Sequence, residues 1–347
     1  MSTDAYRQII AASPRDRLDL FLATANRIGA PVGNVEKDFW VCWTLNSLYH
    51  ERPAGEPRLL FKGGTSLSKG YGLIQRFSED IDVTVFRDDL DEAASVEELE
   101  GLSNKKRRAK LDAIRDACRA YITGPLRDFL TAQLADITNG AGRVELDEAD
   151  ADGQTLLLWY PEVEPRDGAY VRPAIRLESG AKSALDPNRP ITITPYVTEE
   201  AAGIDLTVAD VTTIEATRTF WDKVVIAHGL RRWYERRGEL RQEGQRVSRH
   251  YYDLHCLLGF ETGKAALGDL DLGADCVRHA RMFFDRPDYD LASAVPGSFA
   301  IAPAPKMVDA LTRDYANTAA MIFGTPPSFD DILESARQIE QDINTHS

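Results

Sequence analysis

The chain has 347 residues, 43% of them hydrophobic, which is enough to bury a sizeable core and predicts two or more closely packed parts. Lysine and arginine total 41 against 55 aspartates and glutamates, so the net charge of 41 − 55 = −14 argues against broad electrostatic binding to nucleic acid. The cysteines form no C-x-x-C pair, and neither a signal peptide nor an apolar run of membrane-spanning length is present. We therefore expect a cytoplasmic protein without a disulfide framework or a membrane segment.

Two helices are predicted ahead of the first strand. Ser13 is a typical N-cap, Pro14 fits the first helical position, and the Gly-Ala-Pro sequence at residues 29–31 ends that helix. The apolar spacing between residues 35 and 49 predicts a second helix. A short apolar run at residues 59–61 then predicts a buried strand.

A glycine-led loop follows that strand. Gly63 and Gly64 have no Cβ, so a ligand can approach the main chain closely, and Thr65 and Ser66 can cap a following helix. The N–H groups at a helix start lie at the positive end of its dipole, where a phosphate oxygen binds readily. We therefore expect the segment from Lys62 to Ser66 to bind nucleotide phosphates, with the two hydroxyls as additional donors. The helix is predicted to continue through three further positions, Leu67, Tyr71 and Ile74.

Two aspartates follow on a predicted strand at residues 80–85. Asp80 and Asp82 lie two positions apart, so their carboxylates share one face with Cα atoms about 6.5 to 7 Å apart, while Ile81 and Val83 point into a core. Such a pair can bracket two hard cations about 3.5 to 4 Å apart. Alone, a Gly-Gly-Thr-Ser turn is common and D-x-D is often a solvated face. In the order strand, loop, helix, strand, the two features indicate nucleotidyl transfer.

The middle of the chain combines a helical insert with further strands. The insert is predicted near residues 104–137, and from Thr212 onward the pattern predicts only helices and loops. Arg176 and Glu178 share one face of a strand, either as an ordinary surface pair or as part of a site. The strands of this region are predicted at residues 155–159, 171–178 and 191–197.

Two helices of the C-terminal half carry a charged residue beside an apolar stripe. Lys223 borders one stripe, and Asp253 lies one turn ahead of Leu257 on the margin of another. A carboxylate in that position needs a cationic partner, because an unpaired buried charge is costly. The two residues therefore either serve a site or form a structural salt bridge. The stripe beside Lys223 consists of Phe220, Trp221, Val224, Val225 and His228.

Seven arginines lie in and around the connection between these helices, residues 231–249. One interpretation is a solvated helix in which Glu235 and Glu239 pair with arginines four positions away. The other is a surface for RNA or phosphate, with Trp233 and Tyr234 available for stacking. A second basic patch occupies residues 105–110. The arginines are Arg231, Arg232, Arg236, Arg237, Arg241, Arg246 and Arg249.

Several of these segments together resemble the AbiEii/AbiGii nucleotidyltransferase toxins, a branch of the DNA polymerase β-like superfamily. The most specific match is KGGTSLSKGY at residues 62–71, followed by RFSEDIDV at residues 76–83. The connection at residues 231–249 is longer than in compact members of the family. Further matches lie at residues 35–40, 174–178, 212–225 and 249–254.

This resemblance implies an α+β fold. A polymerase β-like nucleotidyltransferase core, with a mixed sheet and flanking helices, would occupy residues 1–200, and a mainly helical domain would occupy residues 201–347. The implied enzyme is magnesium-dependent, with Mn²⁺ as an alternative ion. Asp80, Asp82 and Glu178 would hold two metal ions.

The resemblance also implies the substrates and partners. Lys223 would bind the phosphates of the NTP and neutralise charge that develops during transfer, and Asp253 would help to organise the site. The acceptor would be the 3′ end of tRNA, whose modification blocks translation. A cognate AbiEi-like antitoxin would oppose the enzyme in a toxin–antitoxin system, in the context of phage defence.

Two alternatives from other functional classes stay open. A small-molecule nucleotidyltransferase of the aminoglycoside-modifying kind shares the core but needs an acidic pocket for a cationic acceptor, and the arginine-rich run argues against it. A nucleotide-binding interaction module would bind NTP without turnover, and the complete set of acids argues against that.

Overall fold

The structure is a computed structural model that describes residues 2–78, 80–164, 172–241 and 246–345, and the chain divides into two compact units. The predicted domain boundary near residue 200 stays a prediction. The last segment of unit 1 ends at Thr213, and the last segment of unit 2 begins at Ile214. Two short segments of the N-terminal half belong to the second unit. Unit 1 comprises Met1–Gly70, Phe77–Ala94 and Asn104–Thr213, and unit 2 comprises Tyr71–Arg76, Ser95–Ser103 and Ile214–Ser347.

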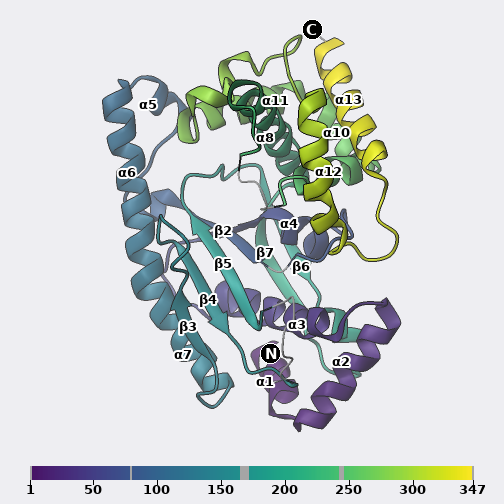
Figure 1. Cartoon of the computed structure of the whole chain (residues 1–347). Coiled ribbons are helices and arrows are strands. Elements are labelled where there is room, and N and C mark those ends of the chain that lie inside the picture. Colours follow the sequence, from purple (N-terminus) through teal and green to yellow (C-terminus); the bar gives the residue numbers. More distant parts are fainter. Residues whose placement is uncertain (1, 79, 165–171, 242–245, 346–347) are drawn as a thin grey trace. The chain divides into compact units, whose positions relative to one another are not determined.

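In the described part of unit 1, a seven-stranded mixed sheet has the strand order β3-β4-β5-β2-β1-β7-β6 (Figure 1). Strand β2 pairs antiparallel with β1 and parallel with β5, and β7 pairs parallel with β1. The mixed sheet with flanking helices confirms the predicted fold class. The strands are β1 (Leu59–Lys62), β2 (Asp80–Val85), β3 (Arg143–Leu146), β4 (Thr155–Trp159), β5 (Ala174–Gly180), β6 (Asn188–Ile193) and β7 (Val208–Ile214).

Side-chain alternation along β2 separates a core face from a polar face. Ile81 and Val83 are fully buried, whereas Asp80 and Asp82 are half-buried on the opposite face, as the period of a strand requires. The neighbouring strand β5 repeats the pattern, with Leu177 buried and Glu178 half-buried. The polar side chains of both strands therefore share one face of the sheet.

Helices flank this sheet. The cap residues of α2 are as predicted: Ser13 accepts a hydrogen bond from the Asp16 N–H, and Gly29 ends the helix with a left-handed φ of 66°. Helices α3 and α6 both pack against β5. The helices of unit 1 include α1 (Ser2–Ala11), α2 (Pro14–Ile28), α3 (Val32–Asn46), α4 (Gly63–Thr65), α6 (Asn104–Tyr121) and α7 (Arg127–Ile137).

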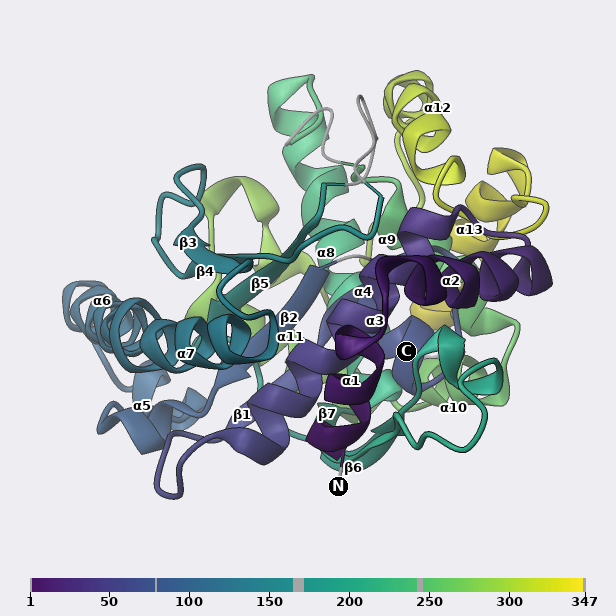
Figure 2. The same ribbon diagram turned by 90° about the horizontal axis from the view of Figure 1, so that it is seen from below.

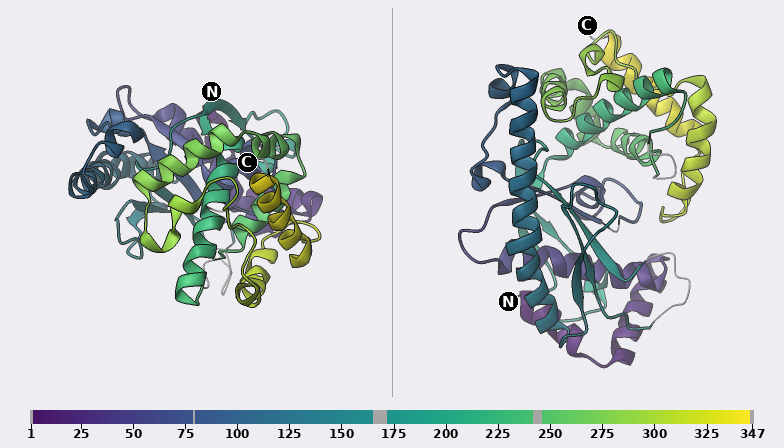
Figure 3. Two further views of the ribbon diagram at one scale, coloured as in Figure 1. Left: turned by 90° about the horizontal axis from the view of Figure 1, so that it is seen from above. Right: turned by 60° about the vertical axis from the view of Figure 1, so that its left-hand side comes forward.

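The predicted helical insert is present. Helices α6 and α7 are joined by the π-helical turn Ile122–Leu126, which contains Pro125, and together they form one rod alongside β3 and β4 (Figures 2 and 3). Helix α7 contacts β3, and the buried side chains of the rod include Ile114, Leu130 and Leu134.

Several predicted boundaries were wrong. The helix after the glycine loop ends with the π-helical turn Ser66–Gly70, and the positions beyond it, Tyr71 and Ile74, are not helical. The strand predicted at residues 191–197 ends at Ile193, and the one predicted at 171–178 begins at Ala174, with Val171 outside the described residues. Strands β3 and β7 were not predicted, and the last residues of β7, from Thr212, had been assigned to helices and loops.

Unit 2 is helical in its described residues and is organised around α8 (Ala216–Arg237), which contacts α9, α10 and α11. Buried side chains of α8 include Phe220, Trp221 and Val224, the predicted stripe. Among the described residues of both units, no helix is long and apolar enough to cross a membrane. The other helices of unit 2 are α5 (Val96–Glu100), α9 (Arg249–Leu258), α10 (Glu261–Gly268), α11 (Leu270–Phe283), α12 (Pro305–Ala319) and α13 (Phe329–Thr345).

Candidate active site

The glycine loop lies between β1 and the short helix α4, as the sequence indicates. Gly63 has a left-handed φ of 77°, and a Cβ at this position would collide with the carboxylate of Asp82, whose Cγ is 2.7 Å away. Both the dihedral angle and the close approach therefore require glycine. The short helix α4 starts at this glycine, so the first residue of the helix lies next to the Asp82 side chain.

The two hydroxyls of the loop have internal partners. The Thr65 hydroxyl contacts Ser78 Oγ at 2.8 Å and donates to the carbonyl of Asp80, the first residue of β2. The Ser66 hydroxyl donates to the carbonyl of Gly63 at 2.8 Å. Both side chains are fully buried. In this arrangement the hydroxyls fix the loop and the start of β2, which leaves main-chain N–H groups as the donors for a phosphate.

The predicted acids lie in register on neighbouring strands. Asp82 of β2 is directly opposite Lys62 of β1 on one side and Glu178 of β5 on the other. Asp80 is opposite Arg176 in the same way. Directly opposite residues point to the same face, so the sheet brings all five charged side chains onto one surface. We call Asp80, Asp82 and Glu178 the acid row.

Basic side chains lie against two members of the acid row. Lys62 Nζ is 3.9 Å from an Asp82 carboxylate oxygen, and an Arg176 Nη contacts the Glu178 carboxylate. Within the described residues, no group of three or more His, Cys, Asp or Glu side chains converges to hold a metal ion. The donor set still suits a hard cation, because Mg²⁺ and Mn²⁺ prefer carboxylate oxygens and the positions beside two acids already take cationic groups.

In unit 2, the structure brings Lys223 and Asp253 together. Lys223 Nζ lies 2.8 Å from one Asp253 oxygen, and Arg76 donates to the same carboxylate through Nε at 2.8 Å and an Nη at 3.0 Å. Lys223 and Asp253 are both buried, whereas the sequence had indicated positions at the margin of the buried stripes. Asp253 is thus shared by two cations.

The electrostatics of this cluster follow from burial and charge. Burial opposes ionisation of Asp253, but Arg76 and Lys223 outweigh it and hold the pKa of the carboxyl well below its usual range. Burial, with repulsion from Arg76, lowers the pKa of Lys223 although Asp253 favours its charged form. The carboxylate is the group that both cations depend on.

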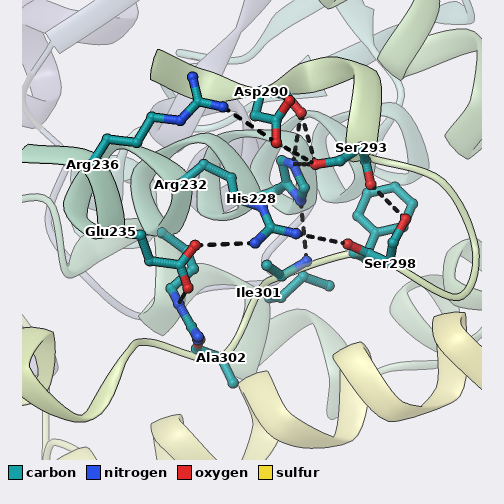
Figure 4. A network of polar contacts seen from close by, with 12 residues as sticks. His228, Arg232, Glu235, Arg236, Asp290, Ser293, Ser298, Ile301 and Ala302 are labelled. Carbon is teal, nitrogen blue, oxygen red and sulfur yellow. Dashed lines mark hydrogen bonds and ion pairs between the residues drawn. The ribbon is translucent and has the colours of Figure 1, made fainter. Parts of the chain in front are cut away.

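Four arginines at the start of the run at residues 231–249 have partners within unit 2, and Figure 4 shows two of them, Arg232 and Arg236. Arg231 pairs with Glu235 at 2.7 Å and donates to the Ala302 carbonyl, and Arg232 donates to the Ser298 carbonyl at 3.2 Å. The i,i+4 pair with Glu235 is the one expected of a solvated helix. Arg236 and Arg237 pair with Asp290 and Asp288, respectively.

A buried ion pair beside the glycine loop was not predicted as a pair. Lys69, on the π-helical turn after the loop, lies 2.8 Å from Asp38 of α3, and its Nζ is 3.5 Å from the centre of the Tyr196 ring. Asp38 also accepts a hydrogen bond from the Tyr196 N–H at 2.7 Å. The sequence signal was the charged sequence Glu36-Lys37-Asp38 inside an otherwise apolar helix. Arg76 was missed for a different reason, since its partner lies 177 residues away.

Comparisons with known proteins agree with these features. The family model described as nucleotidyl transferase AbiEii toxin, type IV toxin–antitoxin system, matches residues 46–335. Among solved structures, the chain is similar to MenT4, a nucleotidyltransferase toxin from Mycobacterium tuberculosis H37Rv. That match has 16% sequence identity and a TM-score of 0.40, and it covers 94% of this chain and 98% of that chain. No curated protein sequence matches the chain.

Proposed function

The chain belongs to the AbiEii nucleotidyltransferase toxin family, and from that premise we propose that it transfers a nucleotide from an NTP to the 3′ end of tRNA and so blocks translation. The observation that carries this proposal is the acid row beside the glycine loop. Asp82 and Glu178 lie opposite each other on β2 and β5, and Asp82 also approaches Gly63. The N–H groups proposed to bind phosphate and the carboxylates proposed to bind metal would then lie at one end of β2.

In this proposal, the chain's own groups bind and orient the two substrates. Main-chain N–H groups from Gly63 to Thr65 and the ammonium of Lys62 would hold the triphosphate, with the Thr65 and Ser66 hydroxyls fixing the loop and the Ser66 N–H bonded to the Gly63 carbonyl. Asp80, Asp82 and Glu178 would hold Mg²⁺. Bound Mg²⁺ would supply a lowered pKa for the acceptor hydroxyl and stabilise the charge on the pyrophosphate.

A buried lysine would contribute positive charge. Lys223 is proposed to neutralise charge on the nucleotide phosphates, and Asp253 to hold the Lys223 ammonium in place. The 2.8 Å contact between the two groups supports the second role directly. Arg76 would keep Asp253 ionised, because it donates two hydrogen bonds to the carboxylate.

We propose that tRNA binds to local basic patches, since the chain as a whole is acidic. Lys105, Lys106 and Arg108 are exposed at the start of α6, where the helix dipole adds to their positive charge. Arg236 and Arg237 retain exposed side chains of 43% and 55%, although both are paired. A cognate AbiEi-like antitoxin is proposed as the opposing partner in the cytoplasm.

The decisive experiment is to incubate the purified chain with total RNA, Mg²⁺ and each labelled NTP in turn. Label should appear in tRNA with at least one NTP, and Asp82→Asn should abolish it while the circular dichroism spectrum stays unchanged. Asp128→Asn, the same change at an exposed position of α7, is the matched control and should transfer normally. Full activity of Asp82→Asn would reject the assigned acids.

The same assay separates the acceptor classes. If label enters an aminoglycoside-like cationic small molecule instead of RNA, the small-molecule alternative replaces the tRNA proposal. For a tRNA acceptor, changing Lys105, Lys106 and Arg108 to Gln should weaken tRNA binding. It should also reduce its salt dependence by about 0.7 to 0.9 log unit per log unit of salt for each phosphate that these side chains no longer neutralise. NTP binding should change little.

A further inference from the structure

Lys62 and Arg176 are counter-ions of the acid row, and they affect how metal and nucleotide bind. Resting on the function proposed above, we infer that Lys62 and Arg176 keep divalent cations off the acid row until a nucleoside triphosphate draws Lys62 away. Metal and nucleotide then bind together rather than one after the other. Lys62 and Arg176 would act on the metal site as positioning residues.

Arg176 has two carboxylate partners. Its Nε donates to Asp147 at 2.9 Å, while an Nη contacts Glu178, the predicted third metal ligand. Asp147 is the less exposed of the two carboxylates, at 14% against 38% for Glu178. Its main-chain N–H also bonds to the carbonyl of Thr155 at 3.0 Å. Arg176 can therefore release Glu178 and stay paired with Asp147, so the release does not leave the guanidinium without a partner.

Lys62 is held more loosely. Its Nζ lies 3.9 Å from the Asp82 carboxylate, near the outer limit of an ion pair, and the side chain is 29% exposed. It directly precedes Gly63, whose loop is proposed to bind the triphosphate. A polyphosphate at the loop competes with Asp82 for the ammonium and is the stronger partner, because it carries several negative charges. Binding of the nucleotide thus frees Asp82.

Linkage between ligands makes this coupling measurable from either side. If the nucleotide removes a cation from the acid row, it raises the affinity for metal, and the metal must raise the affinity for nucleotide by the same factor. A coupling of about tenfold corresponds to the range typical of linked sites. The phosphates of a bound nucleotide also attract the metal directly, so the part of the coupling that comes from the counter-ion is the part that Lys62→Gln lacks.

The test measures Mn²⁺ binding by electron paramagnetic resonance, first with Mn²⁺ as the sole ligand. Arg176→Gln and Lys62→Gln should each bind Mn²⁺ about three- to tenfold more tightly than the parent chain. Arg143→Gln removes the same charge on β3, where Arg143 pairs with Glu145, and should leave the affinity unchanged. Adding a non-hydrolysable NTP analogue should tighten Mn²⁺ binding by the parent at least about tenfold, and by Lys62→Gln less, after subtraction of a protein-free titration.

Two results would overturn the inference. One is equal Mn²⁺ affinity for the parent, Arg176→Gln and Lys62→Gln, all shown to be folded by circular dichroism. The other is parent affinity that does not respond to the analogue. Either result with nucleotide transfer intact removes the inference and leaves the proposed function standing. If the proposed function is wrong, no NTP supports transfer. The Mn²⁺ affinities of the variants can still be compared with that of the parent, because they do not depend on transfer.

Discussion

The ammonium of Lys223 lies 2.8 Å from the carboxylate of Asp253, and that carboxylate also accepts two hydrogen bonds from Arg76. Two buried cations therefore depend on one buried acid. The arrangement is asymmetric. Loss of Lys223 leaves Asp253 paired with Arg76, whereas loss of the Asp253 charge leaves two buried cations facing each other.

This asymmetry predicts that substitutions of Asp253 and Lys223 lower the free energy of unfolding by different amounts. Asp253→Asn should lower the free energy of unfolding by about 3 to 5 kcal/mol, because it leaves buried charges uncompensated. Lys223→Met should lower it by about 1 to 3 kcal/mol, since Arg76 still pairs with the carboxylate. Urea denaturation measures both values. If Asp253→Asn lowers the free energy of unfolding by no more than Lys223→Met does, the two cations do not both depend on Asp253.

The kinetics of a Lys223 variant decide between its two roles. If Lys223 neutralises charge on the nucleotide phosphates, Lys223→Gln should slow transfer strongly at temperatures where the variant is folded. Normal turnover combined with a clear loss of stability would show that the residue forms only the structural salt bridge to Asp253. Arg313→Gln, a change at an exposed position of α12, controls for loss of one positive charge.

Gly63→Ala should damage the site beyond the strain of its backbone. The left-handed φ of 77° costs an alanine about 1 to 2 kcal/mol, and the new Cβ would also displace the Asp82 carboxylate. Gly140→Ala is the matched control, because Gly140 has a φ of 82° and nothing within 4 Å of an added Cβ. Both variants should lose similar stability, but only Gly63→Ala should lose transfer activity. Similar activity in both would show that the close approach to Asp82 is unimportant.

The local elements were predictable where one short segment determines them. Ser13, Pro14 and Gly29 defined α2, and alternation defined β2. Strand β7 was not predicted, because Asp210 adopts a left-handed φ of 51°, which interrupts the alternation of buried side chains. The helix after the glycine loop was predicted too long, since Gly70 ends it although Tyr71 and Ile74 keep apolar spacing.

The sequence indicates the residues of the candidate site but not their contacts. The spacing of Asp80 and Asp82 implied a shared face, yet the register that places Asp82 opposite Glu178 depends on strands nearly a hundred positions apart in the sequence. The pairing of Arg76 with Asp253 spans 177 residues in the same way. Local periodicity carries no information about such partners.

The environment of His228 predicts a loss of stability in acid. Burial, with repulsion from Arg232, lowers the pKa of this imidazole to about 4, and its Nδ1 accepts a hydrogen bond from the Ala300 N–H (Figure 4). The unfolded state, with a pKa near 6.5, binds a proton that the folded state does not, so stability falls as the pH drops from about 6.5 to 4. The loss should reach about 3 kcal/mol.

Urea denaturation between pH 7 and pH 4 tests this expectation for His228. The lowered pKa values of His250 and His255 act in the same direction, so the informative quantity is the difference between the parent and His228→Gln. The variant should be less stable at pH 7 and should lose less stability on acidification. Parallel pH profiles for parent and variant would show that His228 does not titrate in this range.

The last prediction concerns Arg231, which connects α8 to the segment before α12. Its Nε pairs with Glu235 at 2.7 Å, and an Nη donates to the carbonyl of Ala302, so the side chain is part of the packing of unit 2. Arg231→Gln should lower the free energy of unfolding by about 1 to 2 kcal/mol, because a half-buried carbonyl loses a charged donor. Arg313→Gln should change it by less than about 0.5 kcal/mol. If Arg231→Gln is as stable as the parent but binds tRNA more weakly, with a lower salt dependence, Arg231 belongs to the RNA surface rather than to the scaffold.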